Sequence, residues 1–173
     1  GRTFGSQLAG GIDGLKQWIG YEDKHFAQVP FPDGGVRSPK EADDFAYFEK
    51  ALADQGIDGS RVCGVMTETY QGGNSSFAPA KYIQQLRAWC DKHDVVLIMD
   101  EVQAGFGRTG KFWGFEHYDI VPDLIACGKG ISGALPLSGV IGRDDLMDQF
   151  PPGSMTSTHS GNPVCAAGAL ASL

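Results

Sequence analysis

Five apolar residues in a row, Val95 to Met99, end directly in two acidic residues, Asp100 and Glu101. A short run without any polar residue is typical of a strand covered on both faces, as the strands of parallel sheets are. Ligands of open parallel sheets bind beyond the carboxyl ends of the strands. The sequence therefore predicts that Asp100 lies where such a fold binds a ligand.

A second apolar run, Asp123 to Cys127, ends in Gly128, Lys129 and Gly130. We expect it to be a strand, so that one strand end offers a carboxylate and another an amine. The glycines leave the backbone around Lys129 unhindered, which suits a side chain that reaches across a crevice. Each feature alone also has a simpler explanation, because most strand-end acids and most lysines are merely solvated.

The segments around these two runs predict the fold class. Val62 to Glu68 is a predicted strand, and Pro79 opens a predicted helix before Val95, which makes a crossover unit with two parallel strands. The segment Gly130 to Pro136 is too short for a crossover helix, so the next strand, Leu137 to Gly142, is expected to be antiparallel. We predict an α/β fold with a mixed, mainly parallel sheet flanked by helices.

Other segments give local predictions. The pattern at His25 to Phe31 favours a short strand ending at proline. A capping box at Ser38 to Glu41 predicts a helix with Phe45 and Phe48 on its buried face. Asn162 and Pro163 cap a final Ala-rich helix, preceded by a loop rich in Ser and Thr.

Composition limits the class of partner. A formal net charge of −7 argues against a surface for nucleic acid or anionic membrane and favours a small-molecule partner. The four cysteines form no CxxC pair and the four histidines lack metal-ligand spacing, which predicts a reduced, cytoplasmic protein without a structural metal. No apolar stretch reaches about 20 residues, so we expect no membrane span. The chain starts without methionine, and we expect it to be part of a longer protein.

A nucleotide-binding alternative has to be weighed. Apolar residues followed by Asp-Glu are typical of the magnesium-binding strand of ATPases, and Gly105 to Lys111 matches the Gly-x4-Gly-Lys of a phosphate loop. Phe112 stands where the magnesium-binding Ser or Thr belongs, and the loop follows the Asp-Glu strand too closely. A P-loop-like NTPase is therefore the weaker alternative.

Pyridoxal phosphate chemistry accounts for more of the pattern. It needs a lysine to form an imine, a buried carboxylate to keep the pyridine nitrogen protonated, and donors for the phosphate. Lys129, Asp100, the amide of Gln103 and a Ser/Thr-Gly-Asn loop ahead of a helix supply these groups.

Several motifs resemble one family. DEVQAGFGRTG from Asp100, PDLIACGKGISGALPLSGVIG from Pro122 and STHSGNP from Ser157 are similar to the class III aminotransferases, which are pyridoxal phosphate enzymes of fold type I. GRTFG at Gly1 and ETYQGG at Glu68 resemble further family motifs. Lys129 also follows Asp100 by the 29 residues that the family shows.

The resemblance implies a role for five residues. Lys129 matches the Schiff-base lysine, which also moves the proton between substrate and cofactor carbons. Asp100 matches the acid paired with the pyridine nitrogen, Val102 the apolar residue packed against the ring, and Gln103 the amide near the ring hydroxyl. Thr158 matches the threonine that reaches the phosphate of the neighbouring subunit's cofactor, which implies a homodimer; alternatively, its hydroxyl bonds its own backbone.

The sequence also departs from the family pattern. Thr69 replaces the usual proline, and His159 and Ser160 stand where an aromatic residue and a glycine are usual. Gly73 stands where many members have a glutamate that, in users of 2-oxoglutarate, commonly pairs with an arginine. From Gly73 we expect pyruvate or another small keto acid as the amino-group acceptor.

The resemblance implies that residues 1–173 are the central part of a cofactor-binding large domain, without its N-terminal segment and its C-terminal small domain. The intact enzyme is expected to move an amino group from an amine or ω-amino acid to a keto acid, and the isolated segment to be weakly active or inactive. Aminomutase, decarboxylase and racemase reactions on the same scaffold stay open, as does a non-catalytic relative.

Overall fold

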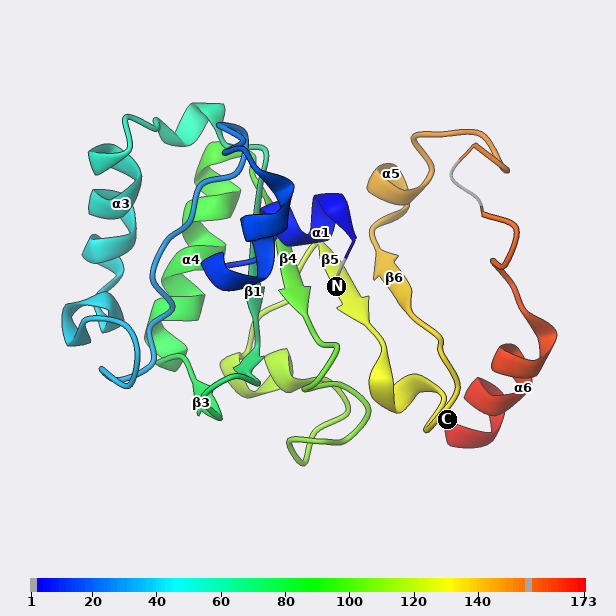
Figure 1. The fold of residues 1–173 in the computed structure, drawn as a ribbon. Coiled ribbons are helices and arrows are strands. Elements are labelled where there is room, and N and C mark those ends of the chain that lie inside the picture. The colour runs from blue at the N-terminus through cyan, green and yellow to red at the C-terminus, as the bar shows by residue number, and fades with distance from the viewer. Residues whose placement is uncertain (1–2, 155–156) are drawn as a thin grey trace.

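Four strands form the central sheet of the computed structural model, which describes residues 3–154 and 157–173 (Figure 1). They are β1 (Gly64–Glu68), β4 (Val96–Asp100), β5 (Leu124–Cys127) and β6 (Gly139–Gly142), and they lie in the order β1-β4-β5-β6. β1, β4 and β5 are parallel, and β6 is antiparallel to β5. The predicted mixed, mainly parallel sheet is therefore confirmed, including the direction of its last strand.

The register brings the carboxyl ends of three strands side by side. Glu68, the last residue of β1, pairs with Asp100, the last residue of β4. Asp100 in turn pairs with Ala126 of β5, so Lys129 follows at the same edge of the sheet. The two predicted site residues thus come from adjacent strands.

Helices lie next to both edge strands of the sheet (Figure 1). α3 and α4 lie on the side of β1, and α6 lies beyond β6 (Figure 1). The α-helices are α1 (Phe4–Ala9), α2 (Asp13–Lys16), α3 (Phe45–Asp54), α4 (Ala80–His93), α5 (Asp144–Met147) and α6 (Pro163–Ser172). Short 3-10 turns are η1 (Gln17–Ile19), η2 (Lys40–Asp43), η3 (Gly59–Arg61), η4 (Gly114–Tyr118) and η5 (Lys129–Ile131). Among the described residues, no helix has the length and apolar character needed to cross a membrane.

The main core lies between α4 and one face of the sheet. Every apolar residue of the predicted α4 stripe is buried: Tyr82, Ile83, Leu86, Trp89 and Cys90. They pack in one cluster with Leu97 and Met99 of β4. Val96 and Ile98, on the other face of β4, are only half-buried in this chain, so the expected cover on both faces is complete on one face only.

Two local predictions are wrong. Residues 25–31 form no strand, and the carbonyl of Gln28 instead accepts a hydrogen bond from the side chain of Gln55. The capping box at Ser38 to Glu41 does not form. α3 begins at Phe45, because Asp44 lies directly before the apolar face and its side chain accepts from the Ala46 backbone N–H.

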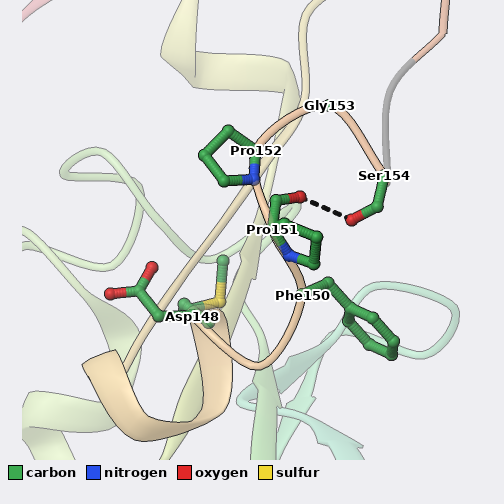
Figure 2. Close-up of a pocket in the computed structure, with 7 residues that line it drawn as sticks. Asp148, Phe150, Pro151, Pro152, Gly153 and Ser154 are labelled. Atoms are coloured by element: carbon green, nitrogen blue, oxygen red, sulfur yellow. Dashed lines mark hydrogen bonds between the residues drawn. The ribbon is translucent and has the colours of Figure 1, made fainter.

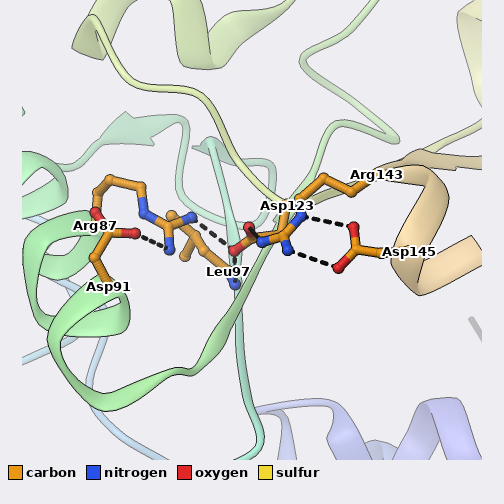
Figure 3. A network of polar contacts seen from close by, with 6 residues as sticks. All are labelled: Arg87, Asp91, Leu97, Asp123, Arg143 and Asp145. Atoms are coloured by element: carbon orange, nitrogen blue, oxygen red, sulfur yellow. Dashed lines mark hydrogen bonds and ion pairs between the residues drawn. The ribbon is translucent and has the colours of Figure 1, made fainter.

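An ionic network fixes the opposite end of β5 (Figure 3). Asp123 precedes β5 and is buried, and its carboxylate accepts hydrogen bonds from the Leu97 backbone over 2.8 Å and from Arg87 and Arg143 over 2.7 and 2.8 Å. Burial alone raises the pKa of Asp123, but these donors outweigh it and hold the pKa below its ordinary value. The network ties the start of β5 to β4, α4 and the end of β6.

A small hairpin follows β1 at the edge where the parallel strands end. It pairs β2 (Tyr70–Gln71) with β3 (Ser76–Phe77), so the predicted turn at Gln71 to Asn74 is confirmed within a hairpin that the sequence did not reveal. The Tyr118 hydroxyl donates to the Thr69 carbonyl over 2.6 Å and accepts from the Ala78 backbone, which clamps both ends of the hairpin.

Candidate active site

The carboxyl ends of β4 and β5 place an acid and an amine at one edge of the sheet. One carboxylate oxygen of Asp100 accepts a hydrogen bond from the backbone N–H of Val102 over 2.9 Å, which holds the side chain at the strand end. The chain then turns back, and Oε1 of Gln103 accepts a hydrogen bond of 2.6 Å from Nζ of Lys129. The structure therefore brings together three of the five predicted site residues: Asp100, Gln103 and Lys129.

The backbone at Lys129 adopts a conformation that is unusual for its residue type. Its φ angle is 39°, in the left-handed region, which costs a non-glycine residue about 1 to 2 kcal/mol. Such conformations persist where the surrounding structure imposes them, and they cluster at functional sites. Lys129 begins the short turn η5 directly after Gly128, so its side chain leaves the sheet at the site edge.

The hairpin approaches Gln103 at Gly72. A Cβ atom at Gly72 would lie 2.7 Å from Oε1 of Gln103, the same oxygen that accepts from Lys129. Because real Cβ atoms do not approach other atoms this closely, any side chain at position 72 displaces the Gln103 amide. The glycine is thus part of the arrangement that presents Gln103 to Lys129.

Glu68 adds a second carboxyl group to this edge. Its pKa is raised above the ordinary value, chiefly because the side chain is partly buried. The Gly72 backbone N–H and the Lys129 amine lower the pKa and the Asp100 carboxylate raises it, with a net upward shift. Glu68 is not among the predicted site residues, although it ends a predicted strand just as Asp100 does.

Glu101 points into the core instead of toward the site. It is fully buried, and its carboxylate accepts hydrogen bonds from the Thr69 hydroxyl over 2.6 Å and from the backbone N–H groups of Gly114 and Phe115 over 2.9 Å each. Successive strand residues face opposite ways, which separates Asp100 from Glu101. Glu101 therefore connects the end of β4 to the start of η4 through hydrogen bonds.

Thr69, which departs from the family pattern, has two bonds that a proline could not form. Its hydroxyl donates to Glu101, and its backbone N–H donates to the Asp100 carbonyl over 3.3 Å. Proline has neither group. The threonine thus extends the pairing of β1 and β4 by one bond at the edge of the site.

The nucleotide-binding alternative is not supported. A phosphate loop joins a strand to the start of a helix. Here Gly105 to Lys111 lies in a series of turns before η4, and Phe106, Gly107 and Gly110 have positive φ angles. Glu101 is already bound by three donors within the protein, so it is not available to polarise a water molecule.

Of the other two predicted residues, Val102 lies beside the lysine–amide pair, and Thr158 belongs to a different segment. Val102 is half-buried, and its side chain lies 3.6 Å from the position a Cβ would take at Gly128, directly before Lys129. Thr158 lies in an exposed turn that precedes α6, and α6 is beyond β6 (Figure 1). Its role toward a second subunit stays a prediction.

One hollow of the described structure lies elsewhere. A space of about 560 Å³ is lined by residues of one segment, from Met147 at the end of α5 to Ser154 (Figure 2). Asp148 is its one charged residue, and a ligand site usually has several polar groups that converge. We therefore place the candidate site at the strand ends.

Comparisons with known proteins identify the family of the chain. The family model described as Aminotransferase class-III matches residues 1–173. The acetylornithine aminotransferase of Caldanaerobacter subterraneus subsp. tengcongensis is 36% identical over 170 residues, which are 97% of this chain and 39% of that protein. The isoleucine 2-epimerase of Lentilactobacillus buchneri is 35% identical over 181 residues, which are 100% of this chain and 40% of the relative. The chain thus spans about two fifths of the length of these relatives.

A solved structure shows the same fold. The (S)-enantioselective omega-transaminase from Thermomicrobium roseum superposes with a TM-score of 0.84 at 28% sequence identity, over 99% of this chain and 41% of that chain. The fold is therefore that of a transaminase, and class III aminotransferases depend on pyridoxal 5′-phosphate. The chain belongs to the class III aminotransferase family.

Proposed function

We propose that this protein transfers an amino group from an amine or ω-amino acid to a keto acid, with pyridoxal 5′-phosphate as cofactor. The observation that carries the proposal is the position of Asp100 and Lys129 at adjacent carboxyl ends of β4 and β5, with Gln103 hydrogen-bonded to the lysine. In parallel sheets this edge is the ligand edge.

The side chains at this edge fit the functional groups of the cofactor. The carboxylate of Asp100 suits a protonated pyridine nitrogen, the amine of Lys129 suits an aldehyde carbon, and the amide of Gln103 suits a ring hydroxyl. Gly72 has no side chain to displace that amide. When bound, the cofactor supplies a ring that accepts electrons from a substrate carbon that loses a proton.

The residues of the chain have separate roles in this proposal. Lys129 would hold the cofactor through Nζ, and the same amine would take the proton from the substrate carbon. Asp100 holds the proton on the pyridine nitrogen, because a fixed carboxylate stabilises that cation. Gln103 orients the lysine amine through the 2.6 Å bond.

Covalent labelling tests the anchor. Borohydride reduction of the full-length enzyme fixes the bond between lysine and cofactor, and peptide mapping then identifies the labelled residue. We expect the label on Lys129 and none in Lys129→Ala. Lys111, the lysine of the phosphate-loop-like segment, is the matched control, and a label on Lys111 contradicts the assignment.

One relative supports a second candidate reaction. The isoleucine 2-epimerase is as similar to this chain as the aminotransferase is, so the shared scaffold alone does not choose the reaction. An epimerase inverts a single amino acid without a keto acid. Incubating the full-length enzyme with one enantiomer and no acceptor distinguishes the two: inversion indicates epimerase chemistry, and amine consumption only when a keto acid is added indicates transfer.

A non-catalytic relative is the remaining alternative. Titration of the full-length protein with pyridoxal 5′-phosphate, followed by absorption spectroscopy, tests it: an enzyme gives a saturable band that Lys129→Ala loses. Two further features stay predictions. One is the homodimer with Thr158 at the neighbour's cofactor, and the other is the assignment of residues 1–173 to part of a large domain. The share of each relative that this chain covers is compatible with that domain assignment.

A further inference from the structure

The loop after β4 lies against the turn that carries Lys129. Cγ1 of Val102 lies 3.6 Å from the position that a Cβ would take at Gly128, the first residue of this turn. The amide of Gln103 accepts the 2.6 Å hydrogen bond from Nζ of Lys129, the second residue. Both contacts belong to the candidate site described above.

Phe106, from the same loop, contacts the third residue of the turn, Gly130. Outside the chain neighbours of Gly130, the three atoms nearest to its Cβ position are Cβ, Cδ2 and Cγ of Phe106, at 3.1, 3.4 and 3.6 Å. The aromatic side chain therefore fills the space beside Gly130. Lys129 is thus contacted at its own amine, and the residues before and after it are contacted by the same loop.

Unusual backbone conformations occur on both sides of this contact. The φ angle of Phe106 is 61° and that of Lys129, directly before Gly130, is 39°. A bulky residue rarely adopts a positive φ angle. Such conformations persist where the surrounding structure imposes them. The contact between Phe106 and Gly130 is one such restraint on the lysine turn.

Other residues of the loop hold Phe106 in place. Its ring packs against the rings of Phe112 and Trp113, with centroid distances of 5.6 and 5.0 Å, which are favourable for aromatic pairs. The Gly107 backbone N–H donates to the Phe112 carbonyl over 3.2 Å and closes the loop on itself. These residues belong to the segment that resembles a phosphate loop, so its glycines and aromatic residues have a structural explanation beside the lysine.

We propose that Phe106 is a positioning residue for Lys129, an inference that rests on the function proposed above. Without the ring, the turn would relax into the space beside Gly130, and the left-handed conformation of Lys129 would no longer be imposed. The amine would then lose its bond to Gln103 and its place beside Asp100. Phe106 thus acts through the geometry of the turn and not by contact with substrate.

Three variants of the full-length holoenzyme test this role. Phe106→Ala removes Cγ and Cδ2, whereas Phe106→Leu retains a carbon in place of each. Phe112→Ala is the matched control, because it removes a ring of the same cluster and leaves Phe106 beside Gly130.

The expected result is a loss of kcat without a matching change in KM. We expect Phe106→Ala to lower kcat about tenfold or more and to change the KM for the amino donor less than about twofold, because displacement of the lysine affects the reaction step. Phe106→Leu and Phe112→Ala should stay within about threefold of the parent in kcat.

Hydrogen exchange of the cofactor-free, full-length protein follows the turn itself. The Ile131 backbone N–H donates to the Gly128 carbonyl over 3.1 Å, and this bond opens when the turn relaxes. We expect the peptide that covers residues 128–132 to exchange about threefold faster or more in Phe106→Ala, and at the parent rate in Phe106→Leu and Phe112→Ala.

Equal losses of kcat in Phe106→Ala and Phe112→Ala, or unchanged exchange of the turn in Phe106→Ala, overturn the positioning role. An equal loss in Phe106→Leu overturns it as well. If urea unfolding shows that Phe106→Ala does not fold, Gly130→Leu takes its place: it pushes against the ring from the turn and should have the same effects. Absence of cofactor binding or of amino transfer in the parent protein overturns the proposed function instead.

Discussion

Nζ of Lys129 lies 2.6 Å from Oε1 of Gln103, and this amide oxygen also fills the space that a Cβ at Gly72 would need. We therefore expect Gly72→Ala to move the amide away from the lysine and to lower kcat about tenfold or more, because small misplacements of catalytic groups are costly. In a Gln103→Ala background, Gly72→Ala should have little further effect. A full loss in that background would show that Gly72 acts by another route.

Asp100→Asn keeps the shape and the acceptor for the Val102 N–H but removes the charge. We expect cofactor to stay bound and kcat to fall about 100-fold or more, because an amide does not stabilise a protonated pyridine nitrogen. Asp148→Asn, which changes an exposed aspartate, is the control. Steady-state kinetics and the cofactor absorption band are the measurements, and unchanged turnover in Asp100→Asn would exclude it from the mechanism.

Thr69→Val removes the hydroxyl that donates to the buried carboxylate of Glu101. The carboxylate keeps its two backbone donors but loses one hydrogen bond, and a hydrogen bond to a charged group contributes about 1.5 to 3 kcal/mol, so the free energy of unfolding should fall by up to that amount. Thr69→Ser, which retains the hydroxyl, should lose less. Urea unfolding of the full-length protein measures both, and equal stability of Thr69→Val and the parent would mean that water replaces the hydroxyl.

Glu68 gives a pH-dependent prediction. Its pKa is raised in the folded protein, first by burial, so the folded state binds the proton more tightly than the unfolded state. Stability from this group is therefore present below the ordinary pKa of 4.5 and is lost as the pH rises through the raised value. Glu68→Gln should then be more stable than the parent near neutral pH, with the difference vanishing as the pH falls through 4.5.

Thermal unfolding at several pH values measures this difference. Glu49→Gln, which changes an exposed glutamate on α3, is the control and should show no such trend. A Glu68→Gln protein that is less stable than the parent at neutral pH would indicate that the bond to the Gly72 N–H outweighs the cost of burial.

The sequence was sufficient to predict the sheet and the positions of Asp100 and Lys129 at one edge of it. The apolar runs that end in Asp100 and before Lys129 both form strands, and the short segment between Lys129 and β6 required an antiparallel return. These features depend on local patterns and chain length. Local patterns and connection lengths are enough to predict the sheet because few strand topologies satisfy them.

Features that depend on contacts between distant segments were not visible in the sequence. Ser38 matched a capping pattern, but its N–H bonds to Asp33, and Asp44 caps α3. The burial of Glu101, directly after Asp100, depends on Thr69 and Gly114, which lie 32 and 13 residues away in the chain. The approach of Phe106 to Gly130 likewise requires the fold to be known.

The antiparallel return of β6 has a consequence for the order of folding. Lys129 lies in the connection of a hairpin, since β5 and β6 pair Cys127 with Gly139, and hairpins close within microseconds. Asp100 reaches the same edge only when β4 pairs with β5, which matches Ile98 with Leu124 across a longer loop and is slower to form. We therefore expect the lysine to lie on a local unit that forms early, and the acid to join it when the parallel pairing is complete.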